Sequence, residues 1–180
     1  DAADYETARN LMVKVVNEEA RRFQFLTESN RLTDTDKMLF GQLLQKEMDD
    51  ETLFCSLREL TELLRKHYEK QVIVLIDEYD VPIAKANTHG YYQEMLNLMK
   101  GIMQALKDNP ALRLAVITGC LKIAKESIFT GTNNFVSDTI ADSRFNEYFG
   151  FTQKEVDQIL EDAEITELAP VIQSWYDGYH

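Results

Sequence analysis

Two acidic side chains that follow a run of apolar residues are the strongest chemical signal in this sequence. Asp77 and Glu78 come directly after residues 72–76, which read VIVLI without polar alternation. A continuous β-branched and aliphatic run of this length predicts a strand buried on both faces of a parallel sheet. Open parallel sheets bind their ligands at the carboxyl ends of their strands. We therefore expect both acids at a sheet edge where a ligand can bind.

The acidic pair matches the Walker B pattern of P-loop ATPases. In that pattern the Asp holds Mg²⁺, usually through water, and the Glu polarises the water that attacks the γ-phosphate. We therefore assign Asp77 to the metal and the nucleotide, and Glu78 to catalysis. The motif is short, and acids also follow strands because loops are solvated, so the assignment depends on structural context. Asp80, which precedes Val81 and Pro82, is expected to be a loop residue.

A second buried strand is predicted over residues 112–118, which read LRLAVIT. Residues 91–106 predict a helix between the two strands, so the segment forms a βαβ unit with parallel strands. Thr118 ends the second strand, which we expect to lie beside the first. Its hydroxyl can bind the attacking water or the γ-phosphate, the part called sensor 1, although many strands simply end in Thr. We assign Thr118 to catalysis.

A polar segment follows the second strand and can line the same edge of the sheet. Lys125 and Asn133 are our candidates there for binding the nucleotide, because a cation near the γ-phosphate stabilises its charge. Spacing alone does not separate Lys125 from Lys122 or Arg144. A turn explains Asn133 equally well.

Helical patterns surround the two strands. Apolar residues recur at intervals of three and four over residues 5–26, 33–46 and 51–68, and Thr152 with Glu155 forms a capping box that begins a later helix. A last helix is expected over residues 167–175. The fold class is therefore α/β, a partial P-loop NTPase-like parallel sheet flanked by helices and rich in helix.

Composition limits the classes of function. The 180 residues, of which 44% are hydrophobic, suffice for one core, so residues 1–180 are expected to form a single domain. The 19 basic and 31 acidic residues give a net charge of −12, which disfavours direct binding to nucleic acid. The cysteines Cys55 and Cys120 belong to no metal-binding cluster, and no segment is apolar for long enough to span a bilayer. We expect a cytoplasmic protein without membrane contacts.

Ordered segments of the chain resemble one known family. VIVLIDEYDVPI, ITGCLKIAKESIFTGTNNF, FNEYFGFTQKEV and WYDGYH, together with SLRELTELLRKHY, are similar to the AAA-ATPase-like domain of a bacterial family. In that family a PD-(D/E)XK nuclease-like domain follows the ATPase-like domain. The resemblance implies an ATP-binding and ATP-hydrolysing module with Mg²⁺ as cofactor, in which Asp77 and Glu78 are the Walker B pair and Thr118 lies near sensor 1.

One departure of the sequence from the family pattern is decisive. Family members carry a Walker A loop upstream, whereas no GxxxxGK[ST] motif occurs between Asp1 and His180. We therefore expect a fragment of a larger protein that hydrolyses ATP poorly or not at all, with the Walker A region and the nuclease-like domain absent. Such a fragment exposes sheet edges, so a homo-oligomer is a possible form.

Two alternatives stay open. The chain could be a non-catalytic binding or regulatory module on a degenerate ATPase fold. It could also use Asp77, Glu78 and Asp80 as a nuclease metal site, but such a site needs a lysine two residues past its acid, and Tyr79 stands there after Asp77. We rank the nuclease site last.

Overall fold

The computed structural model describes residues 2–120, 135–139, 142, 144, 145, 148 and 150–176. The chain divides into two compact units, Asp1–Asn134 and Phe135–His180. The first unit contains both strands, and the second contains the capping box at Thr152.

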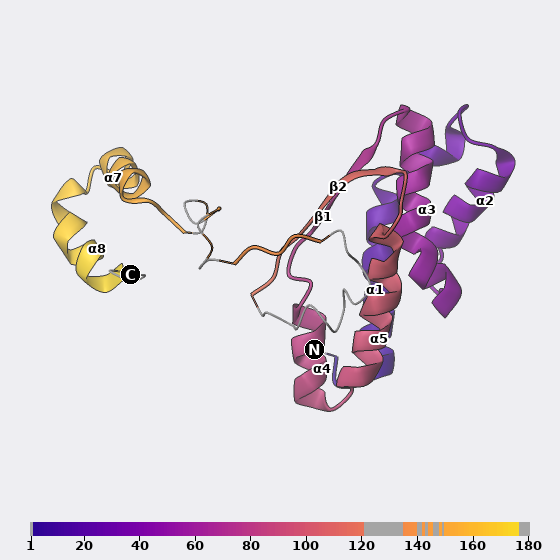
Figure 1. The fold of residues 1–180 in the computed structure, drawn as a ribbon, viewed down its shortest axis with the longest axis horizontal. Coiled ribbons are helices and arrows are strands. Elements are labelled where there is room, and N and C mark those ends of the chain that lie inside the picture. The colour runs from indigo at the N-terminus through magenta and orange to yellow at the C-terminus, as the bar shows by residue number, and fades with distance from the viewer. Residues whose placement is uncertain are drawn as a thin grey trace. The chain divides into compact units, whose positions relative to one another are not determined.

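The first unit consists of helices packed around a pair of strands. Its elements in chain order are α1 (Tyr5–Arg21), the 3₁₀ helix η1 (Gln24–Glu28), α2 (Asp34–Leu43), α3 (Asp50–Tyr68), β1 (Val72–Ile76), α4 (Val81–His89), α5 (Tyr92–Met103), the 3₁₀ helix η2 (Gln104–Leu106) and β2 (Leu112–Ile117). Figure 1 shows β1 and β2 side by side next to a layer that contains α1, α3 and α5. The helices expected before the first strand are confirmed, although the first one ends earlier and is followed by a 3₁₀ turn.

Side-chain caps explain where the early helices begin. The Asp4 carboxylate accepts a hydrogen bond from the backbone N–H of Thr7, and Thr33 forms a capping box with Asp36 at the start of α2. Asp49 caps α3 in the same way, through the N–H of Thr52 at 2.8 Å. Each cap satisfies a backbone donor that has no partner within its helix, which contributes about 1 kcal/mol.

The two strands are parallel neighbours, as the βαβ pattern predicts. Their register pairs Ile73 with Leu114 and Ile76 with Ile117, and an irregularity follows Val72. The strands therefore end side by side, so the residues that follow them share one edge of the sheet.

The prediction that both faces of β1 are buried is wrong for the described part of the chain. Val74 is buried and Ile76 packs against the core, but Leu75 on the other face is 75% exposed. The apolar residues exposed on that face are Ile73, Leu75, Leu114 and Val116. Successive side chains of a strand point to opposite faces, and among the described residues the helices cover only one of them.

Helix α4 directly follows the acidic segment and was not predicted. It begins after Asp80 with Pro82 in its first turn, and it ends at Gly90, whose φ of 83° is left-handed. Proline is tolerated in the first turn because the N–H it lacks would have no partner within the helix. The buried side chains of Ile83 and Ala86 attach α4 to the core, and α4 packs on α5.

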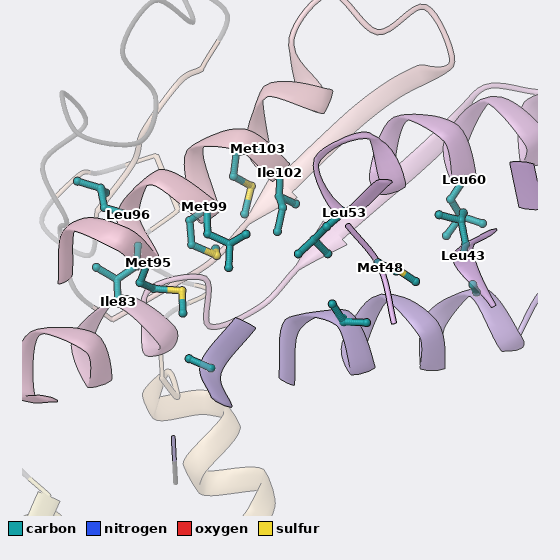
Figure 2. Close-up of a cluster of buried hydrophobic side chains, with 14 of the residues drawn as sticks. Leu43, Met48, Leu53, Leu60, Ile83, Met95, Leu96, Met99, Ile102 and Met103 are labelled. Atoms are coloured by element: carbon teal, nitrogen blue, oxygen red, sulfur yellow. The ribbon is translucent and has the colours of Figure 1, made fainter. Parts of the chain in front are cut away.

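The core of the first unit takes side chains from each of the helices α1 to α5, and α3, α4 and α5 supply the part that lies nearest to α4. Figure 2 shows side chains of all three helices in one cluster, including Leu53 of α3, Ile83 of α4 and Met95 of α5. Methionine has a flexible side chain and fills irregular gaps, which suits the meeting point of three helices. This packing holds α4, the helix that follows the acidic segment, in place.

The second unit contains α7 (Gln153–Asp162), the 3₁₀ helix η4 (Thr166–Leu168) and α8 (Ala169–Tyr176). The predicted capping box is confirmed: Thr152 accepts from the backbone N–H of Glu155, and the Glu155 carboxylate accepts from that of Thr152 at 2.8 Å. Leu160 is the buried residue of α7. None of the helices in the described residues has the length and apolar character needed to cross a membrane.

Candidate functional site

The carboxyl ends of β1 and β2 bring two of the predicted site residues into contact. The ladder continues one step past the strands, because the N–H of Thr118 donates to the carbonyl oxygen of Ile76 at 2.9 Å. The Thr118 hydroxyl donates a hydrogen bond to Oδ1 of Asp77. The parallel register thus places the candidate metal ligand and the candidate sensor side by side.

Glu78 completes this group and has an unusual backbone. Its N–H donates to Oδ1 of Asp77 at 2.9 Å, and its φ of 53° lies in the left-handed region. A residue other than glycine adopts that region at a cost of about 1–2 kcal/mol, and such strain often occurs at functional sites. Two donors, the Thr118 hydroxyl and the Glu78 N–H, therefore orient the Asp77 carboxylate.

The three residues lie at the surface. Asp77, Glu78 and Thr118 are all exposed, so a ligand can reach them from solvent. Behind them, the N–H of Tyr79 donates to the carbonyl oxygen of Thr118 at 3.2 Å. Burial, and then the charge of Asp80, raises the pKa of the Tyr79 hydroxyl. The site thus consists of exposed polar side chains, and the partly buried Tyr79 ring beside them packs against the core.

Asp80 is not the exposed loop residue that the sequence suggests. It is 2% exposed, stands at the start of α4, and its Oδ2 accepts from the N–H of Cys120 at 3.1 Å. An acid placed two residues before Pro82 is a helix-start pattern, so the signal for this position was present in the sequence.

The side-chain oxygens at this edge come from Asp77, Glu78 and Thr118. The described residues contain no group of three or more His, Cys, Asp or Glu side chains that could hold a metal. Magnesium in nucleotide sites is bound by one or two carboxylates, by phosphates and by water. Asp77, already oriented by Thr118, can supply such a carboxylate.

Most of the predicted cationic and amide partners fall on residues that the structure does not describe. Lys125 and Asn133, like Lys122, lie outside the described residues. Arg144 belongs to the second unit, where it lies 3.7 Å from a carboxylate oxygen of Asp138 and 4.9 Å from the ring centroid of Phe145. The structure therefore brings Asp77, Glu78 and Thr118 together. The roles assigned to all the site residues stay predictions.

Comparison with known proteins gives the family. No solved structure matches the chain. An uncharacterized protein encoded in the vnfD 5′ region of Azotobacter chroococcum mcd 1 is 34% identical over 125 residues, which is 66% of this chain and 24% of that protein. The chain thus spans about a quarter of the length of this relative. A model of the AAA-ATPase-like family, described as predicted AAA-ATPase, matches residues 2–129, a range that contains the whole βαβ unit and the acidic pair. The chain therefore belongs to the AAA-ATPase-like family.

Proposed function

We propose that the protein containing this chain binds and hydrolyses ATP, and that the edge formed by Asp77, Glu78 and Thr118 positions the metal and the attacking water. One observation carries the proposal: the Thr118 hydroxyl binds the Asp77 carboxylate where two parallel strands end, next to Glu78. Membership of the AAA-ATPase-like family supports it. The sheet we propose is of the P-loop type, with β1 carrying the Walker B acids.

The chemistry divides between these residues. Water attacks the γ-phosphorus, the P–O bond to the β–γ bridging oxygen breaks, and ADP leaves. Glu78 orients the water and takes its proton, while Thr118 holds Asp77 in place and can accept a hydrogen bond from the water. A bound Mg²⁺ would neutralise charge on the phosphates, and Asp77 would hold it through oxygen.

The grip on the phosphates is proposed to come from sequence outside this chain. ATP sites of this class need backbone N–H groups and a lysine around the β- and γ-phosphates, and GxxxxGK[ST] does not occur in the 180 residues. We therefore expect the chain alone to hydrolyse ATP poorly. Any nuclease activity of the whole protein would belong to a separate nuclease-like domain, as the family resemblance implies.

Mg²⁺-dependent ATP turnover by the full-length gene product tests the proposal. Glu78→Gln is expected to lower kcat about 100-fold or more, because it removes the general base. Glu47→Gln, at an exposed position in the segment before α3, is the matched control and should leave turnover unchanged. Equal turnover by wild type and Glu78→Gln would contradict the role of the acidic pair. Multiple turnover by the 180-residue chain alone would contradict an external phosphate loop.

The second candidate is a non-catalytic binding or regulatory module on a degenerate ATPase fold. A full-length protein without an intact GKS or GKT motif would favour this candidate, whereas an intact motif would favour catalysis. Under this alternative the full-length protein binds nucleotide or a partner but does not release ADP, and Glu78→Gln has no effect on binding. In both cases we propose a cytoplasmic protein, and the free thiols of Cys55 and Cys120 are compatible with a reducing compartment.

A further inference from the structure

Asp80 is a carboxylate that the proposed ATPase chemistry does not use. It is 2% exposed, whereas Asp77 and Glu78 of the same segment are exposed. Burying a carboxylate costs free energy unless hydrogen bonds compensate it. The contacts of the Asp80 carboxylate therefore indicate its structural role.

Both carboxylate oxygens of Asp80 face the segment that follows β2. Oδ2 accepts a hydrogen bond from the N–H of Cys120 at 3.1 Å. Oδ1 lies against Gly119, where a Cβ would come within 2.6 Å of it. The same added Cβ would lie 2.7 Å from Cε1 of the Tyr79 ring. Only glycine fits between these groups, so the two segments that follow the strands meet closely.

This contact completes a series of links between the two segments. Thr118 donates its hydroxyl to Asp77 and accepts from the N–H of Tyr79, and the Cys120 N–H reaches Asp80. The links therefore continue beyond the end of the β ladder. The contacts join residues 77–80 to residues 118–120 in order along both segments. A shift of the Asp80–Cys120 contact would therefore change the distance between Thr118 and Asp77.

Asp80 also connects these segments to the core. Its carbonyl oxygen accepts from the N–H of Ala84 at 2.9 Å in the first turn of α4. That helix is anchored by Ile83, which is 1% exposed. The carboxylate thus holds the end of β2 against an element that packing keeps in place.

We propose that Asp80 is a positioning residue, which holds the Thr118–Cys120 segment so that the Thr118 hydroxyl stays on Asp77. The inference rests on the proposed function. Substitution of a residue that orients the ligands of a site commonly lowers activity, although the residue does not contact the substrate. Small displacements of reacting groups are enough to lower the rate. Asp80 has this role because its buried carboxylate accepts the backbone N–H of Cys120, two residues after Thr118.

The test compares Asp80→Ala and Asp80→Asn in the full-length protein. Asp80→Ala removes the acceptor for Cys120 and is expected to lower kcat for ATP about 10- to 100-fold with little change in KM. Asp80→Asn keeps an oxygen that can accept this bond and should recover most of the wild-type kcat. A ligand role in the metal site would instead make Asp80→Asn as inactive as Asp80→Ala and raise the Mg²⁺ concentration required. Either that pattern or an unchanged kcat in Asp80→Ala overturns the proposal.

Gly119→Ala tests the same contact from the opposite side. The new methyl group would meet Asp80 and Tyr79, so kcat should again fall while KM changes little. Gly41→Ala is the matched control, because nothing lies within 4 Å of the Cβ position there, and it should leave kcat unchanged. Equal kcat values for Gly119→Ala and wild type would contradict the close fit.

Hydrogen exchange of the Cys120 amide, measured by NMR on the 180-residue chain, separates this inference from the proposed function. Asp80→Ala should remove the protection of that amide, and Asp80→Asn should keep most of it. If the full-length protein shows no turnover that depends on Glu78, the proposed function fails while the exchange data still decide whether Asp80 holds Cys120. Unchanged exchange in Asp80→Ala would overturn the positioning role whatever the ATPase result.

Discussion

The hydroxyl of Thr118 donates a hydrogen bond to Oδ1 of Asp77, although 41 residues separate the two in the sequence. The contact exists because β1 and β2 are parallel and in a register that pairs Ile76 with Ile117. A shift of one residue along either strand would turn the Thr118 side chain to the other face. The register of this strand pair therefore sets the geometry of the candidate site.

Removal of the Thr118 hydroxyl should impair turnover while the fold persists. Thr118→Val keeps the shape of the side chain but leaves Asp77 with one fewer donor, so kcat of the full-length protein should fall about 10- to 100-fold. Thr118→Ser keeps the donor and should retain most activity. A steady-state ATPase assay distinguishes the two variants, and equal loss in both would show that the methyl group matters as much as the hydroxyl.

The left-handed backbone conformation of Glu78 should lower the free energy of unfolding, because a residue with a Cβ is strained there. Glycine adopts this region without a Cβ clash, so Glu78→Gly should unfold with a free energy about 1 kcal/mol higher than Glu78→Ala. Urea unfolding of the 180-residue chain measures the difference. Both variants lose the candidate base, so each should be inactive in the full-length protein. Equal stability of the two variants would mean that the backbone at this position is relaxed.

Asp36 should make the free energy of unfolding of the first unit fall at acidic pH. Its buried carboxylate accepts from Nζ of Lys66 at 2.6 Å and from the Thr33 backbone at 3.1 Å. The bond to Lys66, and then the Thr33 bonds, hold the pKa of Asp36 below its ordinary value despite burial. The pKa is lower in the folded state, so this stabilisation is present above about pH 4 and is lost as the pH falls below it.

Denaturant unfolding at pH 7 and pH 3 checks this sign. Asp36→Asn should lower the free energy of unfolding at pH 7 by about 1–3 kcal/mol and should change it much less at pH 3. Asp34→Asn, at an exposed position in the first turn of the same helix, is the control and should have a small effect at both values. A loss for Asp36→Asn that is as large at pH 3 as at pH 7 would contradict the linkage.

The Asn109 side chain should stabilise the turn that precedes β2. Its Nδ2 donates to Oγ1 of Thr61 at 3.0 Å and to the carbonyl oxygen of Ala105 at 3.1 Å, and its Oδ1 accepts from the N–H of Ala111 at 2.9 Å. Asn109→Ala leaves these buried groups without that partner, which should cost about 1–3 kcal/mol in thermal or urea unfolding. Asn97→Ala, on an exposed face of α5, is the control. Similar stabilities for the two variants would refute the bridging role.

Local patterns predicted the elements well where a cap or a period marked them. The Thr152 capping box and the VIVLI strand lie where the sequence indicated. Helix α4 was missed because nine residues with a proline near the start give little periodicity, and its stability comes from burying Ile83. Tertiary contacts of this kind are not visible in a short sequence window.

The burial of the strands was predicted wrongly for a related reason. An uninterrupted apolar run shows that both faces suit a nonpolar environment, but the sequence of the strand does not say what covers them. Leu75 is exposed among the described residues because no element there lies over that face.

The candidate site was predicted in part. Parallel topology was enough to expect Thr118 near Asp77, and the family comparison confirms the AAA-ATPase-like resemblance. The role of Asp80 could not be derived, because it depends on the close approach of Gly119 and on the direction of a single N–H group of Cys120. Lys125, Asn133 and the nuclease-like domain stay predictions.

The uncovered face of the sheet has a practical consequence for work with the chain alone. β1 reads VIVLI, with no charge, glycine or proline, and in the described residues the sheet consists of two strands, so each has an unpaired edge. Such a segment is a template for intermolecular cross-β assembly. We expect the isolated chain to form thioflavin-binding aggregates as its concentration rises, and we expect Leu75→Lys, which puts a charge on the open face, to delay them.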